Sequence, residues 1–126
     1  MLRAFRLLLR PGGATGFYTI HTSPGLDERL RQRAHRSGPW AVAAAHQPGE
    51  LLRRAGYVDV AEFDVTDEFR TTARLWIEQW DTHRDALIEL HGEADFASRQ
   101  ALRRTELQAI EEGLLCRSLV VGRRPG

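Results

Sequence analysis

The strongest constraint on the fold is an apolar stripe in the second half of the chain. Its members follow one another at alternating spacings of four and three residues. That rhythm keeps side chains on one face of an α-helix, and Thr66, which two acidic residues follow, is a typical N-cap. We therefore predict a helix over residues 66–92 with one continuously buried face, formed by Phe69, Ala73, Trp76, Trp80, His83, Leu87 and Leu90.

A second helical pattern follows directly after Gly92. Phe96, Leu107, Ile110 and Leu114 recur on one stripe, which predicts a helix over residues 94–112 that Gly113 ends. Two long helices that are separated by a single glycine favour an antiparallel pair. We therefore expect a helical hairpin over residues 66–115.

Polar residues interrupt both apolar stripes. Gln100 and Arg103 lie in the middle of the second helix, and His83 lies in the first. An antiparallel hairpin brings His83 and Arg103 to similar heights beside Trp76 and Trp80, where they could line a pocket. Alternatively, the two tryptophans are ordinary core aromatics, and Arg103 lays its stem over them in a cation–π contact.

Proline and glycine divide the first half of the chain into short elements. Pro11 and the two glycines after it end a helical leucine pattern. Residues 16–22 then carry apolar and β-branched side chains on both alternating faces, which predicts a strand buried on both sides. Further breaks predict helices over residues 26–36 and 48–55, and strands over residues 57–65 and 118–123. The pattern is that of an α/β protein.

The composition suits one domain over residues 1–126. A net charge of +1 gives no electrostatic argument for a nucleic acid or an anionic membrane as partner. The longest apolar run, residues 40–45, is far shorter than the ~20 residues that span a bilayer. The single cysteine, Cys116, suits a reducing compartment. We expect a soluble, cytoplasmic protein, although the apolar, arginine-interrupted start also leaves a transit peptide open.

Familiar catalytic patterns are missing from the sequence. The five histidines show no metal-ligand spacing, so we expect no metal. Cys116 and Ser23 have no neighbouring sequence context that would activate a nucleophile. The only glycine-rich loop, residues 11–16, lies between a helix and a strand, which reverses the order found in phosphate-binding loops.

Four segments together resemble the C-terminal half of class I S-adenosylmethionine-dependent methyltransferases. They are residues 9–13 (LRPGG), 16–21 (GFYTIH), 51–60 (LLRRAGYVDV) and 118–123 (SLVVGR). The resemblance implies an α/β fold with a partial Rossmann-like sheet of three mixed strands, in which the last strand runs antiparallel between the other two. The hairpin of residues 66–115 would be an insertion before that strand, where small-molecule methyltransferases often build a cap or substrate wall.

The resemblance implies methyl transfer from S-adenosylmethionine to a small molecule. The family holds this cofactor with a glycine loop after its first strand and an acid after its second, and this chain contains neither. We therefore expect a truncated methyltransferase that has no catalytic or cofactor-binding residue, binds no cofactor alone and is inactive alone. Candidate substrate-facing residues are Tyr18, His21, Thr22, Trp76, Trp80, His83 and Arg103, although His21 could instead be a hydrogen-bonded strand-end residue.

The same resemblance implies an open edge on the strand of residues 16–22, because the family's neighbouring strand belongs to the other half. An N-terminal half or a second copy of the chain could pair with this edge. A non-catalytic interaction domain that acts through the edge is the alternative function. A free-standing small-molecule binder that uses the hairpin is a third.

Overall fold

The structure, a computed structural model, describes residues 1–38 and 46–126. The apolar run of residues 40–45 lies outside this part. The elements follow in the order α1 (Leu2–Leu8), β1 (Ala14–Thr22), α2 (Glu28–Ser37), α3 (Pro48–Arg54), β2 (Val58–Asp64), α4 (Thr66–Thr82), α5 (Arg84–His91), α6 (Glu93–Glu111) and β3 (Leu115–Arg123). No helix in the described ranges is long and apolar enough to cross a membrane.

The three strands form one sheet in the order β1-β3-β2. β3 is antiparallel to both neighbours, from Thr22↔Leu115 to Ala14↔Arg123 along β1. β1 and β2 therefore run parallel to each other, and the last strand lies between them as the resemblance implies. β3 begins at Leu115, three residues earlier than the expected start at residue 118. The α/β fold class is confirmed.

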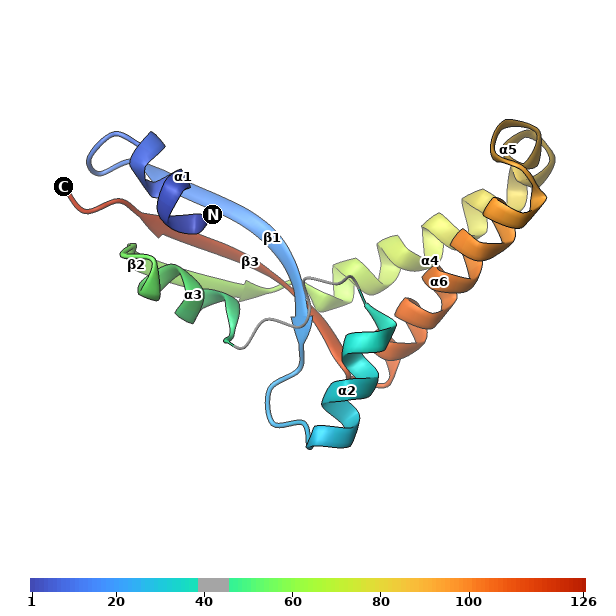
Figure 1. Cartoon of the computed structure of the whole chain (residues 1–126), viewed down its shortest axis with the longest axis horizontal. Coiled ribbons are helices and arrows are strands. Elements are labelled where there is room, and N and C mark those ends of the chain that lie inside the picture. Colours follow the sequence, from blue (N-terminus) through green and yellow to red (C-terminus); the bar gives the residue numbers. More distant parts are fainter. Residues whose placement is uncertain (39–45) are drawn as a thin grey trace.

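The sheet separates two apolar clusters. On one face, Leu52 of α3 and Val120 of β3, which are both 0% exposed, belong to one cluster. Leu2 of α1 and Phe17 of β1 pack against this cluster. On the other face, Ile20 packs against a cluster built from α2, α4, α6 and the start of β3. Figure 1 shows α1 and α3 beside the sheet, while α4 and α6 project from it as an arm that ends at α5.

The expectation that β1 is buried on both faces is wrong. None of its residues is fully buried, and Tyr18 is 57% exposed. The helices on Tyr18's face lie at the carboxyl-terminal end of the strand, where Ile20 meets their cluster. On this face, the helices therefore cover Ile20 but leave the Tyr18 side chain exposed.

The predicted long helix over residues 66–92 is two helices. α4 ends at Thr82 and α5 begins at Arg84, because His83 leaves the helical region with φ −101° and ψ 25°. Gly92, at φ 88°, then turns the chain into α6, a conformation that favours glycine. The helical hairpin is present, with a break in its first arm.

The prediction of one continuously buried stripe is also wrong. Phe69 and Trp80 are buried, whereas Trp76 is 53% and Leu90 is 75% exposed. The arm projects away from the sheet, and among the described residues α4 is covered mainly by α6, so part of its apolar stripe stays exposed. Periodicity identified the apolar face correctly, but only part of that face has a neighbour.

Thr66 is the first residue of α4 and not its N-cap, a position that Val65 takes. The Asp64 carboxylate accepts hydrogen bonds from the Thr66 hydroxyl and, at 2.9 Å, from the Thr66 amide. These bonds, the hydroxyl first, lower the pKa of Asp64. The Thr66 hydroxyl oxygen also accepts from the Arg117 amide at 3.1 Å, which ties the start of the arm to β3.

We predict that the chain self-associates through β1. Within the described residues β1 has one strand neighbour, so the other edge of this strand offers unpaired backbone groups beside the exposed Tyr18. Light scattering at high micromolar concentration should show association, and Tyr18→Lys should reduce it by placing a charge at the edge. Leu90→Lys, an equally drastic change on α5 at the tip of the arm, should leave it unchanged. A monomer under these conditions would contradict the prediction.

Candidate functional site

A cavity of about 560 Å³ lies between the sheet and the helical arm. We call it the arm cavity. Strands β1 and β3 form its floor, and α4 and α6 form its walls. Its lining is mostly apolar and aromatic, with two arginines and one glutamate, and consists of Tyr18, Thr19, Ile20, Phe69, Thr72, Ala73, Trp76, Arg103, Glu106 and Arg117.

Arg103 is held in the wall by a buried polar contact. Its guanidinium carbon lies 3.9 Å from the centre of the Trp80 ring and 5.5 Å from that of Trp76. Its Nη1 donates to Oε1 of Gln100 at 3.4 Å. Gln100 is 1% exposed, and it donates in turn to the carbonyl of Ile77 and to Asp81 Oδ1 at 3.1 and 3.0 Å. Gln100 thus joins α6 to α4 and orients Arg103.

Arg117 approaches the same cavity from β3. Its guanidinium carbon lies 4.4 Å from the Tyr18 ring centre and 5.3 Å from that of Phe69. Within the described residues neither Arg103 nor Arg117 forms an ion pair with a carboxylate. Arg104, next along α6, instead reaches Asp81 Oδ2 at 2.8 Å. The arm cavity thus contains two half-buried arginines that form no ion pair, although Glu106 lies close enough to Arg103 for the two charges to interact.

Glu106 is the one acidic residue in the described lining of the arm cavity. Burial raises its pKa, and the nearby Arg103 opposes that rise. Burial also lowers the pKa of Arg103. Both shifts follow from the limited access of water to this end of the cavity.

The hairpin residues proposed from the sequence lie in three environments: the lining of the arm cavity, the buried contact between the helices, and the exposed helix break that is described below. Trp76 and Arg103 line the arm cavity, together with Tyr18. Trp80 is buried behind Arg103 and stacks on Phe96, with a centroid distance of 5.7 Å. The cation–π arrangement of Arg103 over the tryptophans is present, as the alternative interpretation expected.

His83 does not take the position expected beside the tryptophans. It is exposed at the break between α4 and α5. The imidazole that stacks on Trp80 belongs to His91, with a centroid distance of 5.9 Å and an interplanar angle of 13°. The helix break and the turn at Gly92 bring His91 back along the arm.

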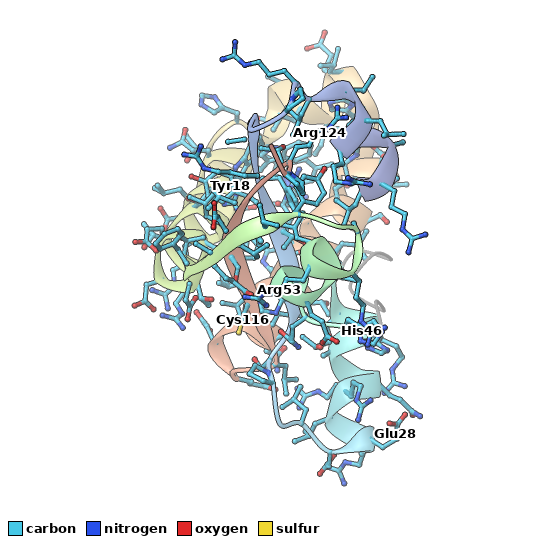
Figure 2. The ribbon with its side chains drawn as sticks, turned by 90° about the vertical axis from the view of Figure 1, so that its left-hand side faces the viewer. Tyr18, Glu28, His46, Arg53, Cys116 and Arg124 are labelled. Atoms are coloured by element: carbon cyan, nitrogen blue, oxygen red, sulfur yellow. The ribbon has the colours of Figure 1, made fainter. Side chains whose placement is uncertain are left out.

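His21 and Thr22 line a different, smaller cavity of about 200 Å³, together with His46. Figure 2 shows the labelled Tyr18 and His46 on opposite sides of the ribbon. Nδ1 of His21 donates to the carbonyl of Thr22 at 2.9 Å, so in the neutral ring Nε2 accepts from the Ser118 hydroxyl at 2.8 Å. His21 is therefore a hydrogen-bonded strand-end residue, and the structure does not bring it together with Tyr18.

Two charged residues of the arm cavity, Arg117 and Glu106, are absent from the candidates drawn from the sequence. Arg117 was placed before the last strand, although the alternating pattern could have been extended back to Leu115. Glu106 follows Arg103 by three residues, a spacing that puts both on one side of a helix. That spacing was a usable signal.

The glycine loop of residues 11–16 does not fit the phosphate-free, amide-lined turn that holds S-adenosylmethionine in the family. The amides of the glycine loop are used inside the protein, since Gly12 donates to the carbonyl of Arg124 at 3.0 Å and Gly13 to that of Arg10 at 2.8 Å. This loop therefore offers no free amide cradle. Nor does the described part of the chain contain a group of three side chains that could hold a metal ion.

Comparison of the fold with solved structures gives extensive matches to methyltransferases. Phosphoethanolamine N-methyltransferase 2 of Haemonchus contortus, in a complex with phosphomonomethylethanolamine and S-adenosylhomocysteine, matches with a TM-score of 0.79 at 14% identity. A Galdieria sulphuraria protein described as a sarcosine dimethylglycine methyltransferase matches with a TM-score of 0.81 at 12% identity. The chain has a class I methyltransferase fold.

The matches cover nearly all of this chain but only part of each solved structure. They include 99% of the chain and 29% of the Haemonchus protein, and 98% of the chain and 46% of the Galdieria protein. The cyclopropane synthase MmaA2 of Mycobacterium tuberculosis matches with a TM-score of 0.70 at 14% identity, over 97% of the chain and 48% of that protein. No protein-family model and no curated protein sequence matches the chain.

The two tryptophans should differ in their contribution to stability. Trp80→Ala removes a buried ring that contacts Phe96, His91 and Arg103, and should lower the free energy of unfolding by about 3 to 5 kcal/mol. Trp76→Ala removes a half-exposed ring and should cost much less. Urea denaturation followed by circular dichroism measures both. Equal losses in the two variants would contradict this assignment.

Glu106 should destabilise the fold at neutral pH. Its pKa is raised in the folded state, so the folded chain binds more protons than the unfolded one as pH rises from the ordinary glutamate pKa to the raised value. Stability contributed by the protonated form is therefore lost over that interval. We expect Glu106→Gln to raise the Tm at pH 7 and to lose this advantage near pH 4. Glu89→Gln, which changes an exposed carboxylate on α5, serves as the control.

Proposed function

We propose that this chain forms the substrate-side part of an S-adenosylmethionine-dependent methyltransferase that acts on a small molecule. The observation that carries the proposal is the arm cavity, which a methyltransferase-type sheet and a helical arm enclose together. Its volume of about 560 Å³ is in the range of small-molecule sites, which are lined mainly by apolar and aromatic groups. The cavity is the proposed acceptor site.

The chain's own residues would hold and orient the acceptor. Tyr18, Phe69 and Trp76 offer flat apolar surfaces, and Arg103 and Arg117 offer hydrogen-bond donors. Fixing an acceptor in one orientation supplies a large part of the rate enhancement of a group transfer. S-adenosylmethionine, when bound by an intact methyltransferase, supplies the methyl group. The glycine loop of this chain does not fit it, so its site would lie in another part of the enzyme.

Exposed apolar side chains support a partner for the sheet. Phe5 and Leu8 on α1 are 50% and 81% exposed, and Tyr18 and Phe63 on the strands are 57% and 53% exposed. A partner that extends the sheet could cover these side chains. The proposed partner is an N-terminal half that carries the glycine loop and the remaining strands of the sheet.

A non-catalytic interaction domain remains the second candidate function, and the free edge of β1 favours it. In that case the edge would pair with a partner that brings no cofactor site. The two candidates differ in whether a complex of the chain with its partner transfers methyl groups.

We predict that the isolated 126-residue chain neither binds S-adenosylmethionine nor transfers its methyl group. Titration calorimetry, with a complete methyltransferase as positive control, should show no heat of binding. Micromolar binding by the chain alone would contradict this prediction.

The partner half can be sought in the DNA that precedes the Met1 codon and in adjacent genes. We expect a segment that encodes a strand, a glycine loop and a helix in that order. Co-expression with this segment should give a complex that binds the cofactor and methylates a small acceptor. A complex that forms but binds no cofactor would favour the interaction domain.

A further inference from the structure

We propose that the arm cavity binds a small organic acid, in which a carboxylate or phosphate group is attached to a flat apolar body. Arg103 and Arg117 would hold the anionic group, and the aromatic side chains would hold the body. The proposal deepens the proposed function, on which it rests for the identification of this acid as the methyl acceptor. Binding of the acid itself is a property of the chain alone.

The charge of the lining is the first argument. Two half-buried arginines line the same cavity, and neither forms an ion pair with a carboxylate among the described residues. The charge of Glu106 acts on Arg103, so it offsets only part of the positive charge of the lining. A charge that is partly removed from water without a partner is unfavourable. A bound carboxylate or phosphate would restore the missing hydrogen bonds, and guanidinium groups match both anions in a bidentate geometry.

The aromatic contacts are the second argument. Arg103 lies over Trp80, and Arg117 lies over Tyr18 and Phe69. Contacts with ring faces place each cation without using the N–H groups that an anion needs. Gln100 further orients Arg103 from a buried position. Both cations are therefore positioned in advance, which reduces the entropy lost when a ligand binds.

The rest of the lining specifies the body of the ligand. Ile20, Phe69 and Ala73 form apolar surfaces between β1 and α4, and Trp76 closes the α4 side with a half-exposed ring. These groups favour a flat apolar or aromatic body. Glu106 adds one negative charge against two positive ones, and burial raises its pKa, which weakens its repulsion of a bound anion.

Titration calorimetry on the full chain can test the proposal with three probes of similar shape. They are 2-naphthoate, 2-naphthyl phosphate and the neutral 2-naphthamide. We expect at least one of the two acids to bind ten or more times tighter than the amide. The tighter acid identifies the preferred anionic group. Equal affinity for the amide and both acids would overturn the proposal.

Variants assign the anion to the two arginines. Arg117→Gln and Arg103→Gln should each weaken binding of the preferred acid tenfold or more, whereas Glu106→Gln should leave it equal or tighter. The matched control is Arg123→Gln, which removes the same charge from an exposed residue at the far end of β3. Unchanged binding in Arg117→Gln, or an equal loss in Arg123→Gln, would overturn the assignment.

A conservative variant and an activity assay separate the remaining outcomes. If Arg117→Gln fails to fold by circular dichroism, Arg117→Lys decides, because it keeps the charge but loses the bidentate geometry and should weaken binding less than tenfold. Acid binding without methyl transfer in the complemented enzyme would retain this site and reject the proposed function. A complemented enzyme that methylates only neutral acceptors would retain the proposed function and reject this site.

Discussion

The pairing of β3 with both β1 and β2 is the interaction on which the rest of the structure depends. β3 comes from the end of the chain, and its register along β1 runs from Thr22↔Leu115 to Ala14↔Arg123. Leu115 and Val120 are both fully buried, and they contribute to the clusters on opposite faces of the sheet. Each cluster is therefore complete only when the last strand is in place. Such long-range pairing carries a large loop-closure cost and slows folding.

The same strand fixes the helical arm. Val65 donates its amide to the carbonyl of Arg117 at 2.9 Å, and the hydroxyl of Thr66 receives the amide of Arg117 in return. On the other side, Ile110 and Leu114 pack with Phe69 directly before the chain enters β3. Both ends of the arm are thus held at one point of the sheet. The arm cavity is the space between this anchored base and β1.

Apolar packing and charge have separate roles along the arm. Trp80, Phe96 and the buried Gln100 join α4 to α6, while the outer surfaces of both helices carry ion pairs such as Arg74 with Glu111. Exposed pairs of this kind contribute little to stability. Arg103 and Arg117 differ because they face the cavity and have no such partner among the residues described. These two arginines, which form no ion pair among the residues described, therefore both lie at the proposed ligand site.

The sequence by itself determined the α/β class, the order of the strands and the presence of a helical hairpin, but not the break that divides the first arm of the hairpin into α4 and α5. Prolines and glycines end elements locally, as at residues 11–13, and periodicity identifies the apolar face of a helix from its own residues. The contact of Arg103 with the tryptophans was also predictable, because two antiparallel helices that meet near Gly92 leave few registers.

Only the tertiary structure decided how much of each apolar face is covered. Trp80 is buried because Phe96 of α6 and His91 of α5 stack on it, whereas Trp76 on the same stripe lines the arm cavity and is half-exposed. The break at His83 decided that His91 stacks on Trp80. The early start of β3 placed Arg117 in the arm cavity, while the pleat placed His21 in the other cavity. Spacing along one segment carries no information about the neighbour that packs against it, and that neighbour comes from residues distant in the chain.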